Sequence, residues 1–444
     1  MLVRTRQLAI KLRASLWPVP VLAVVVGAAA GLVIPRLDEA RGLHDLLGRV
    51  DLLVPLLDTD SRSAQTILGS VAGALATLLG VLFSITIVAL QLASSQYSPR
   101  VIPRFRADRL SRTVLASLIC TVTFLVVALP GLPSEAPPRV TLVVAILLAL
   151  SCFCLVPIFL HHLARLIDSA TIIRQIGADA VEVARRLEFD HAETLHDADF
   201  PPDPRIVRAI SAGYVVEVDR KALRRAVPRG ARMLRLEARM GDFVIPGLPL
   251  LAIWPRVELD EATRRRICAA FVLKEERRQD QDLLFCVRQL VDVALRALSA
   301  AINDVTTAVM AVNELGLVVE AFQSRNPAVE DGFRKERCGD CVLFVPTLGL
   351  RTFLRDCFDE IARDAGSQLR VTARMLEVME QVIEAARPPP EHREVYAQTG
   401  RWIEESAAQE GATTVEKAYF DERYRSLLRR AAGVALPDEE PALQ

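Results

Sequence analysis

Residues 63–99 read SAQTILGSVAGALATLLGVLFSITIVALQLASSQYSP, a run of 37 residues without a charged side chain between Arg62 and Arg100. A helix needs roughly 20 apolar residues to cross a bilayer. This stretch is therefore long enough to span a membrane and to continue beyond it. It predicts a fold organised around membrane-spanning helices.

Small and polar residues recur along this helix at alternating steps of four and three, which places them on one face. We call this face the seam; it comprises Thr66, Ser70, Gly73, Thr77, Gly80, Ser84, Gln91 and Ser94, with Ile87 at the one apolar position. Two interpretations fit it. Small residues let helices pack closely while hydroxyl groups bond across the contact. Alternatively, the hydroxyl groups and Gln91 line a water-filled path. Both can hold in one oligomer.

Three more charge-free stretches have the length of a membrane span, namely 14–35, 113–134 and 140–164. Basic residues concentrate in 1–15, in 100–112 and after 165, whereas 36–62 and 130–139 are less basic. Short basic loops stay in the cytoplasm. The alternation predicts four spans, with both termini cytoplasmic. Few of the 54 basic residues are lysine, which is typical of GC-rich bacterial genomes. Together with the four spans, this predicts a multi-pass protein of the bacterial inner membrane.

Composition separates an apolar part from a soluble part. Hydrophobic residues make up 51% of the 444 residues, and the excess lies in the first 165. The 54 basic and 54 acidic residues give a net charge of zero, so nothing indicates nucleic-acid binding. None of the eight cysteines falls in the two loops predicted outside, so no disulfide framework is expected.

The fold class expected is a membrane α-helical domain followed by a cytoplasmic α+β region. Its parts are a four-helix transmembrane domain at 1–165, a helical extension and linker at 166–204, a small β module at 205–256, a mainly helical cytoplasmic domain at 257–435 and a disordered tail at 436–444. In the β module, Gly241-Asp242 and Pro246-Gly247 frame a stretch that resembles the tight hairpin of lipoyl-type modules, without a lysine to carry lipoate or biotin.

Polar residues near a predicted helix–helix junction form a candidate ligand site. Asp292 lies on a strongly amphipathic helix, and Ser299, Asn303 and Asp304 lie at the junction that follows it. Capping and turn formation would account for these residue types. Helix-terminal amides and a carboxylate would also bind an ion or a small molecule. The sequence leaves both interpretations open.

Arginines follow the seam helix directly, at Arg100, Arg104, Arg106, Arg109 and Arg112. They either set the topology and meet anionic lipid, or attract anions at the cytoplasmic mouth of a pore. Near the end of the fourth span, His161 and His162 point about 100° apart on a helix, so they cannot chelate together. We expect them to be solvated.

Motifs for catalysis are absent from the sequence. Cys338 and Cys341 form a lone C-x-x-C, without the second pair that a zinc site needs; a redox pair is the alternative. There is no glycine-rich phosphate loop, H-E-x-x-H or G-x-S-x-G. We predict no catalytic residues, no metal site, no cofactor and no enzymatic activity.

Two stretches carry a family resemblance. One is Ala89-Leu-Gln-Leu-Ala-Ser-Ser-Gln-Tyr-Ser-Pro-Arg100; the other runs from Gln281-Asp282 through Ala297-Leu-Ser-Ala-Ala-Ile-Asn-Asp304 to Thr307-Ala308. Together they resemble a bacterial family of predicted membrane proteins classed as a domain of unknown function. Ala300 and Val305 stand where that family usually has proline. The resemblance implies an integral membrane protein and supplies no activity.

The seam favours a homo-oligomeric pore or channel-like protein in the lipid bilayer, with a cytoplasmic regulatory domain and an ion or small-molecule ligand. The alternative is a membrane-anchored cytoplasmic sensor or scaffold that conducts nothing. The two hypotheses differ in the role of the seam. In a scaffold the seam only packs helices, so the small size of its residues is all that matters.

Overall fold

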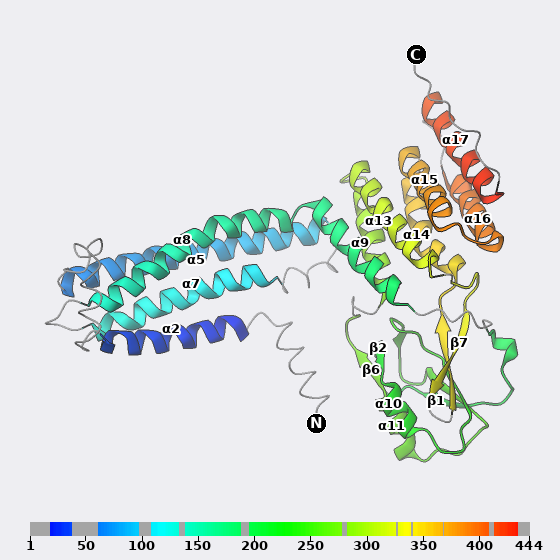
Figure 1. The fold of residues 1–444 in the computed structure, drawn as a ribbon, viewed down its shortest axis with the longest axis horizontal. Coiled ribbons are helices and arrows are strands. Elements are labelled where there is room, and N and C mark those ends of the chain that lie inside the picture. Colours follow the sequence, from blue (N-terminus) through cyan, green and yellow to red (C-terminus); the bar gives the residue numbers. More distant parts are fainter. Residues whose placement is uncertain are drawn as a thin grey trace. The chain divides into compact units, whose positions relative to one another are not determined.

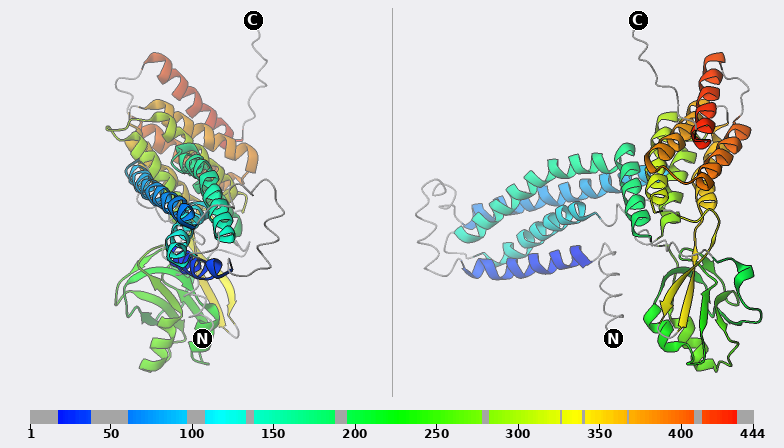
Figure 2. Two further views of the ribbon diagram at one scale, coloured as in Figure 1. Left: turned by 90° about the vertical axis from the view of Figure 1, so that its left-hand side faces the viewer. Right: turned by 45° about the vertical axis from the view of Figure 1, so that its right-hand side comes forward.

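The computed structural model describes ten stretches of the chain, which separates into two compact units, Met1–Thr171 and Ile172–Gln444 (Figures 1 and 2). The stretches are residues 18–37, 61–96, 108–132, 138–187, 195–277, 282–325, 327–338, 341–366, 368–407 and 413–433. The tail predicted at 436–444 lies outside them.

Long helices form the first unit. They are α2 (Pro18–Leu37), α5 (Ser61–Gln96), α7 (Arg109–Ala128), which continues into the 3-10 turn η2 (Leu129–Gly131), and α8 (Arg139–Leu166). They coincide with the four predicted spans to within a few residues. At 1.5 Å per residue, α2 and α7 are about 30 Å long, the thickness of a bilayer's hydrocarbon core, and α5 is about 54 Å long.

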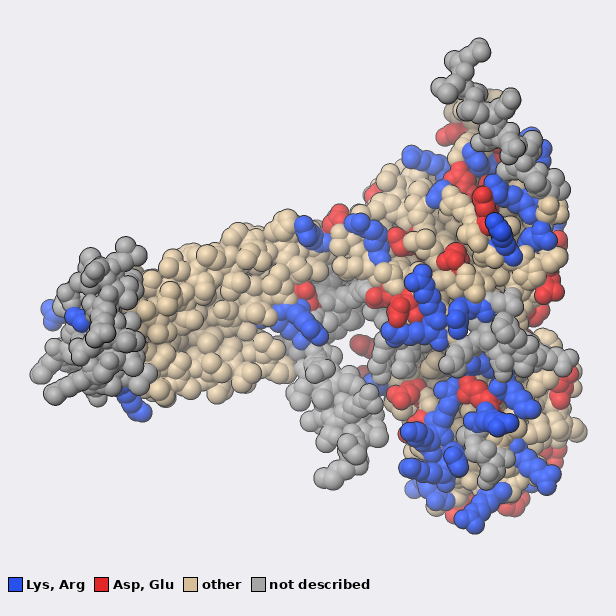
Figure 3. All heavy atoms as spheres, in the orientation of Figure 1, with Lys and Arg blue, Asp and Glu red and all other residues tan. Residues whose placement is uncertain are grey.

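Helix α7 is central in this bundle and contacts α2, α5 and α8. Its Leu118, Phe124 and Leu125 are fully buried among apolar residues of its neighbours. The outer faces instead expose large apolar side chains, such as Leu22, Phe153 and many others. Figure 3 shows this outer surface as a band without charged residues. Water disfavours each Å² of such surface by about 25 cal/mol, so hydrocarbon is the medium that fits it.

Two glycines hold α2 against α7. A Cβ atom added at Gly31 would lie 2.9 Å from the carbonyl oxygen of Phe124, and one at Gly27 would collide with the carbonyl oxygen of Cys120. Their spacing of four residues puts both on one face, where small residues let two backbones approach. Close helix packing through glycine therefore occurs in this bundle between α2 and α7.

Five helices among the described stretches are long and apolar enough to cross a membrane, one more than predicted. The fifth is α13 (Val305–Gln323) of the second unit, whose mean hydropathy is 1.5, against 2.2 or more for the other four. In α13, 56% of the apolar window is buried, compared with 33% or less in the others. Its neighbours α12 and α15 provide this cover.

The β strands of the second unit form two small sheets. The five-stranded sheet has the order β1 (Arg205–Arg208), β5 (Pro249–Trp254), β3 (Met233–Leu236), β8 (Cys341–Thr347), β7 (Gly332–Cys338); the three-stranded one has the order β4 (Phe243–Val244), β2 (Gly213–Val218), β6 (Phe271–Lys274). Only β3 and β8 pair in parallel among these strands. Two short helices, α10 (Arg220–Ala226) and α11 (Glu261–Ala269), pack against each other beside the sheets.

This pairing corrects the hairpin expected around Pro246-Gly247. Strand β4 pairs with β2, and β5 pairs with β1 and β3, so the segments on either side of the turn belong to different sheets. The sheets also take in β6 and the β7–β8 hairpin, which lie outside the expected module at 205–256. The alternation of apolar and polar residues along one strand does not reveal which distant strand it pairs with.

The other α-helices of the second unit are α12 (Leu283–Leu298), α13, α14 (Leu350–Ala365), α15 (Leu369–Ala386), α16 (Pro390–Ser406) and α17 (Thr414–Ala431). Helix α9 (Ser169–Arg186) begins in the first unit and continues into the second, and a 3-10 turn, η3 (Asp197–Asp199), precedes β1. Phe322 of α13 stacks on Phe353 of α14 with ring centroids 4.1 Å apart, and both are fully buried.

A polar network is enclosed in this helical core. The amide of Gln323 lies 2.8 Å from Nδ1 of His392, and the hydroxyl of Tyr396 donates to its oxygen over 3.2 Å. All three side chains are buried. Burial lowers the pKa of His392, because a charged imidazolium would lose its hydration there.

Replacing Gly31 by leucine should weaken the α2–α7 contact by about 1–3 kcal/mol, since the backbone of α7 cannot move aside. Ala29→Leu is the matched control, because Ala29 lies on the exposed face of the same helix. Unfolding of the purified protein in mixed detergent micelles measures both. Equal stabilities of the two variants would show that this contact tolerates a side chain.

The burial of neutral His392 predicts a loss of stability in acid. The folded state binds a proton less readily than the unfolded state, whose histidine pKa is about 6.5, so stability is complete above that pH and falls as the pH drops below it. Denaturant midpoints between pH 8 and pH 5 measure this in wild type and in His392→Gln. The variant should lose part of the wild-type decline. An identical pH profile would contradict the assignment.

Candidate functional sites

Helix α5 has a covered face and an open face. The side chains that it buries in the bundle are Ala64, Leu68, Ala72, Leu75, Leu82 and Ala89. The seam lies elsewhere: every member whose side chain is described, from Thr66 to Gln91, is exposed, and so is Ile87. The side chain of Ser94 lies outside the described residues. The seam is therefore turned away from α7 and α8.

The seam glycines have open space beside them. A Cβ atom added at Gly73 or Gly80 would meet nothing within 4 Å. The contrast is with Gly27 and Gly31, which are covered by α7. Within one copy of the described chain, the seam therefore packs against no helix, and both interpretations of it require another molecule or water.

Polar groups along the seam differ in how they are satisfied. The hydroxyl of Thr66 donates to the carbonyl of Arg62, and that of Thr77 to the carbonyl of Gly73, each over 3.0 Å. The structure gives Ser84 and Gln91 no hydrogen bond to any described residue. An unmet amide is costly in hydrocarbon, so Gln91 would need water or another polar partner wherever lipid tails surround it.

The expected mouth is described only in part, because Arg100, Arg104 and Arg106 lie outside the described residues. Arg109 and Arg112 occupy the first turn of α7. Asp108 caps that helix by accepting from the backbone amide of Ser111 over 2.7 Å.

A histidine fixes the same helix end to α8. Nε2 of His162 lies 3.0 Å from Oδ1 of Asp108, and the imidazole is only 28% exposed. The expectation that both histidines are solvated is therefore wrong for His162, although His161 is exposed. The partner is 54 residues away in sequence, which local periodicity does not reveal.

The junction between α12 and α13 uses its polar groups for capping. Asp304 accepts from the amide and the hydroxyl of Thr307 over 3.0 and 2.6 Å, and these bonds lower its pKa. The hydroxyl of Ser299 donates to the carbonyl of Arg296, and Asn303 adopts a left-handed conformation with φ +47°. Val305 follows as the first helical residue, a position at which proline is also favoured.

Asp292 is not brought into this junction. Its carboxylate accepts from Nε of Arg288 over 2.7 Å, one turn earlier on α12, and the same guanidinium reaches Glu360 of α14. About 10 Å of helix separates Asp292 from Ser299. Three of the four predicted ligand residues thus lie together and are exposed. The fourth, Asp292, pairs along α12 with Arg288, which also contacts Glu360 of α14.

Cys341 is bound within the sheet. Its thiol donates to the carbonyl of Ala231 over 3.0 Å. Cys338 lies opposite in the β7–β8 register, and its side chain is outside the described set. Across the described stretches, no group of three or more His, Cys, Asp or Glu side chains is arranged to hold a metal ion.

A buried ion pair that the sequence analysis did not single out joins the β strands to the helices. Asp282 caps α12 through the amide of Phe285 and also accepts two hydrogen bonds from Arg277, at 2.7 and 2.8 Å. Only 7% of its side chain is exposed. Gly241 lies against the pair, since an added Cβ would be 2.5 Å from Oδ2 of Asp282. Gly241 is required for two reasons: a side chain would collide with Asp282, and the φ of +94° is one that other residues rarely adopt.

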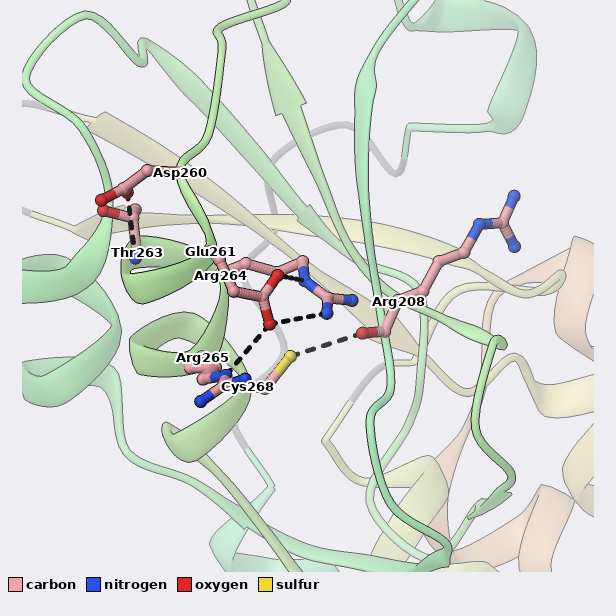
Figure 4. Close-up of polar contacts among 7 residues, drawn as sticks. All are labelled: Arg208, Asp260, Glu261, Thr263, Arg264, Arg265 and Cys268. Carbon is pink, nitrogen blue, oxygen red and sulfur yellow. Dashed lines mark hydrogen bonds and ion pairs between the residues drawn. The ribbon is translucent and has the colours of Figure 1, made fainter.

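Basic side chains on α10 and α11 were also missed. Figure 4 shows Glu261 of α11 between Arg264 and Arg265, which donate to it over 2.8 and 3.0 Å. These bonds lower the pKa of Glu261 to about 2. Cys268 points inward to the carbonyl of Arg208, and burial raises the pKa of its thiol. The signal that would have revealed this face is the excess of arginine in 220–232.

The first unit is a bundle of long apolar helices that share a buried core and expose apolar side chains on their outer faces. Such a bundle, followed by an α+β region, defines a multi-pass membrane protein. The chain belongs to the family described as "Predicted membrane protein (DUF2254)", whose model matches residues 13–381. This confirms the resemblance to an uncharacterised family of predicted membrane proteins.

Relatives include uncharacterised proteins of Mycobacterium bovis and Mycobacterium tuberculosis. Each is 26% identical to this chain over 452 residues, covering 98% of the chain and 82% of the relative. No solved structure matches the chain.

Asp282→Asn should destabilise the second unit by about 2 kcal/mol, because asparagine still caps the helix but leaves Arg277 without its carboxylate. Asp260→Asn is the control, since Asp260 caps α11 in the same way without such a pair and should cost under about 1 kcal/mol. Urea unfolding of the full chain in detergent compares them. Indistinguishable midpoints would contradict a stabilising role for the ion pair.

Proposed function

We propose that the protein is a homo-oligomeric, channel-like membrane protein in which the α5 helices of several subunits face one another through the seam. The observation that carries this proposal is the exposure of the seam, with its two open glycines, away from the rest of the bundle. From Thr66 to Gln91 the seam extends for about 38 Å, more than the thickness of the hydrocarbon core.

The topology proposed has four spans, α2, α5, α7 and α8, with both termini and the second unit in the cytoplasm of a bacterial cell. The distribution of arginine and lysine around the spans supports this orientation. Helix α13 is not counted as a span, because α12 and α15 cover more than half of its apolar stretch.

In such an oligomer, seam hydroxyl groups and Gln91 would replace the hydration of a passing ion, and Ile87 would form an apolar constriction. Arg100, Arg104, Arg106 and Arg109 would surround the cytoplasmic mouth and attract anions. The α+β region would act as gate or regulatory domain. The proposal needs no metal or cofactor.

Substitutions on the seam test conduction. Thr77→Val keeps the shape and removes the hydroxyl, and Gln91→Leu removes the amide. Each should change single-channel conductance in planar bilayers, by about twofold or more for Gln91→Leu. Ile67→Val, on an exposed apolar position, is the control. If folded wild-type protein produced no current across the bilayer, this would contradict the channel proposal.

The size of the seam residues tests assembly separately. Gly80→Leu should leave one protomer intact, because nothing lies within 4 Å, yet separate the subunits. Ala74→Leu enlarges another exposed position of the same helix, about 120° around the helix from Gly80 and therefore off the seam. Light scattering in detergent measures the mass of the protein assembly for each variant. An unchanged mass for Gly80→Leu would exclude the seam as the subunit contact.

A membrane-anchored sensor or scaffold is the second candidate. It is favoured by the threonine hydroxyl groups that already bond within α5, and by Ser299, Asn303 and Asp304, which remain exposed beside one another. Here Gly80→Leu would still disrupt assembly, but Thr77→Val would have no effect, because only the small size of the seam would matter.

A further inference from the structure

Helices α10 and α11 present a basic face at one end of the β region. They bury Leu223, Ala226 and Ile267 against the sheet core. The opposite sides of both helices carry arginine and lysine, and Figure 3 shows basic residues gathered over this part of the second unit. The basic face comprises Arg220, Lys221, Arg224, Arg225, Arg229, Arg232, Arg264, Arg265 and Arg266.

Positive charge is concentrated here although the whole chain is neutral. Residues 219–232 hold six basic side chains and a single acid, Asp219. That acid is occupied as the N-cap of α10, where it accepts from the amide of Ala222 over 2.9 Å. The local excess is therefore not offset within the segment.

Only part of this charge is neutralised by neighbouring side chains. Arg220 pairs with Glu336 of β7 over 2.7 Å, and Glu261 occupies Arg264 and Arg265. Lys221, Arg224, Arg225 and Arg229 form no ion pair with any residue that the structure describes. All four are exposed. Unpaired guanidinium groups are suited to bind phosphate oxygens, because their planar forks donate two parallel hydrogen bonds.

We propose that this basic face docks on the anionic headgroups of the bilayer in which α2, α5, α7 and α8 reside. Thirty-eight residues connect the end of α8 to the start of β1, and 18 of them form α9. The module thus stays within roughly 100 Å of the membrane. Such tethering makes weak contacts with headgroups effective. The inference goes beyond conduction and holds with or without a pore.

The apolar side chains of the β region do not belong to this face. Phe243 and Ile245 are more than half exposed, and Phe243 pairs with Tyr214 at the start of β2, whereas α10 follows the end of that strand. The docking proposed here is consequently electrostatic. It should weaken as salt screens the charges.

The test uses the full chain in nanodiscs of purely zwitterionic lipid or with added phosphatidylglycerol. Hydrogen exchange of peptides covering 219–232 should slow about fivefold or more in the anionic nanodiscs at low salt. The protection should disappear at high salt. Arg224→Glu/Arg225→Glu should abolish it, whereas Arg425→Glu/Arg429→Glu, an exposed pair on α17, should retain it.

Equal exchange of wild type in both lipids would overturn the proposal, as would protection that persists at high salt. Protection in zwitterionic nanodiscs by added RNA, without an effect of anionic lipid, would overturn it in favour of nucleic acid. If the double glutamate variant misfolds, Arg224→Gln/Arg225→Gln replaces it and should lose most of the protection. The salt dependence of wild type needs no variant.

Discussion

A polar group in hydrocarbon must find a partner without help from bulk water, and this constraint bears directly on the polar face of α5. Its backbone is satisfied by the helix itself, and Thr66 and Thr77 return their hydroxyl groups to the preceding turn. Ser84 and Gln91 lie on the same open face without such a partner in the described chain. The proposed oligomer would supply partners for these two side chains, either from water or from another subunit.

Glycine serves opposite purposes in neighbouring helices of this bundle. Gly27 and Gly31 are covered by α7, so that α2 and α7 form a closely packed pair. Gly73 and Gly80 have open space beside them that no described residue of the same protomer fills. The central α7 supplies the cohesion of the bundle, and α5 is held by it along one side only. A helix arranged in this way is free to make intermolecular contacts without disturbing its own fold.

Charge-free runs bounded by arginine were sufficient to predict the four helices of the first unit. The thickness of the hydrocarbon core fixes how many consecutive apolar residues a spanning helix needs. Asp304 was predictable as a candidate cap for the same kind of reason, since its effect is confined to one turn. The covered side of α5 was not predictable, because leucines surround the seam on several sides. Contacts between distant segments, such as His162 with Asp108 and β8 with β3, left no local pattern. The basic face was visible in the sequence, but its exposure required the packing of α10 on α11.

The apolar character of α13 has a consequence for how the chain is made. Among the described residues, five helices are long and apolar enough for the insertion machinery to take up during synthesis, and the last of them emerges after α12 and a short turn. Much of its cover comes from α15, which is still to be translated. Until then α13 is a competitor for the lipid phase, and its insertion would carry α14 to α17 to the other side. Its lower hydropathy and its contact with α12, which is translated just before it, favour packing within the second unit over insertion.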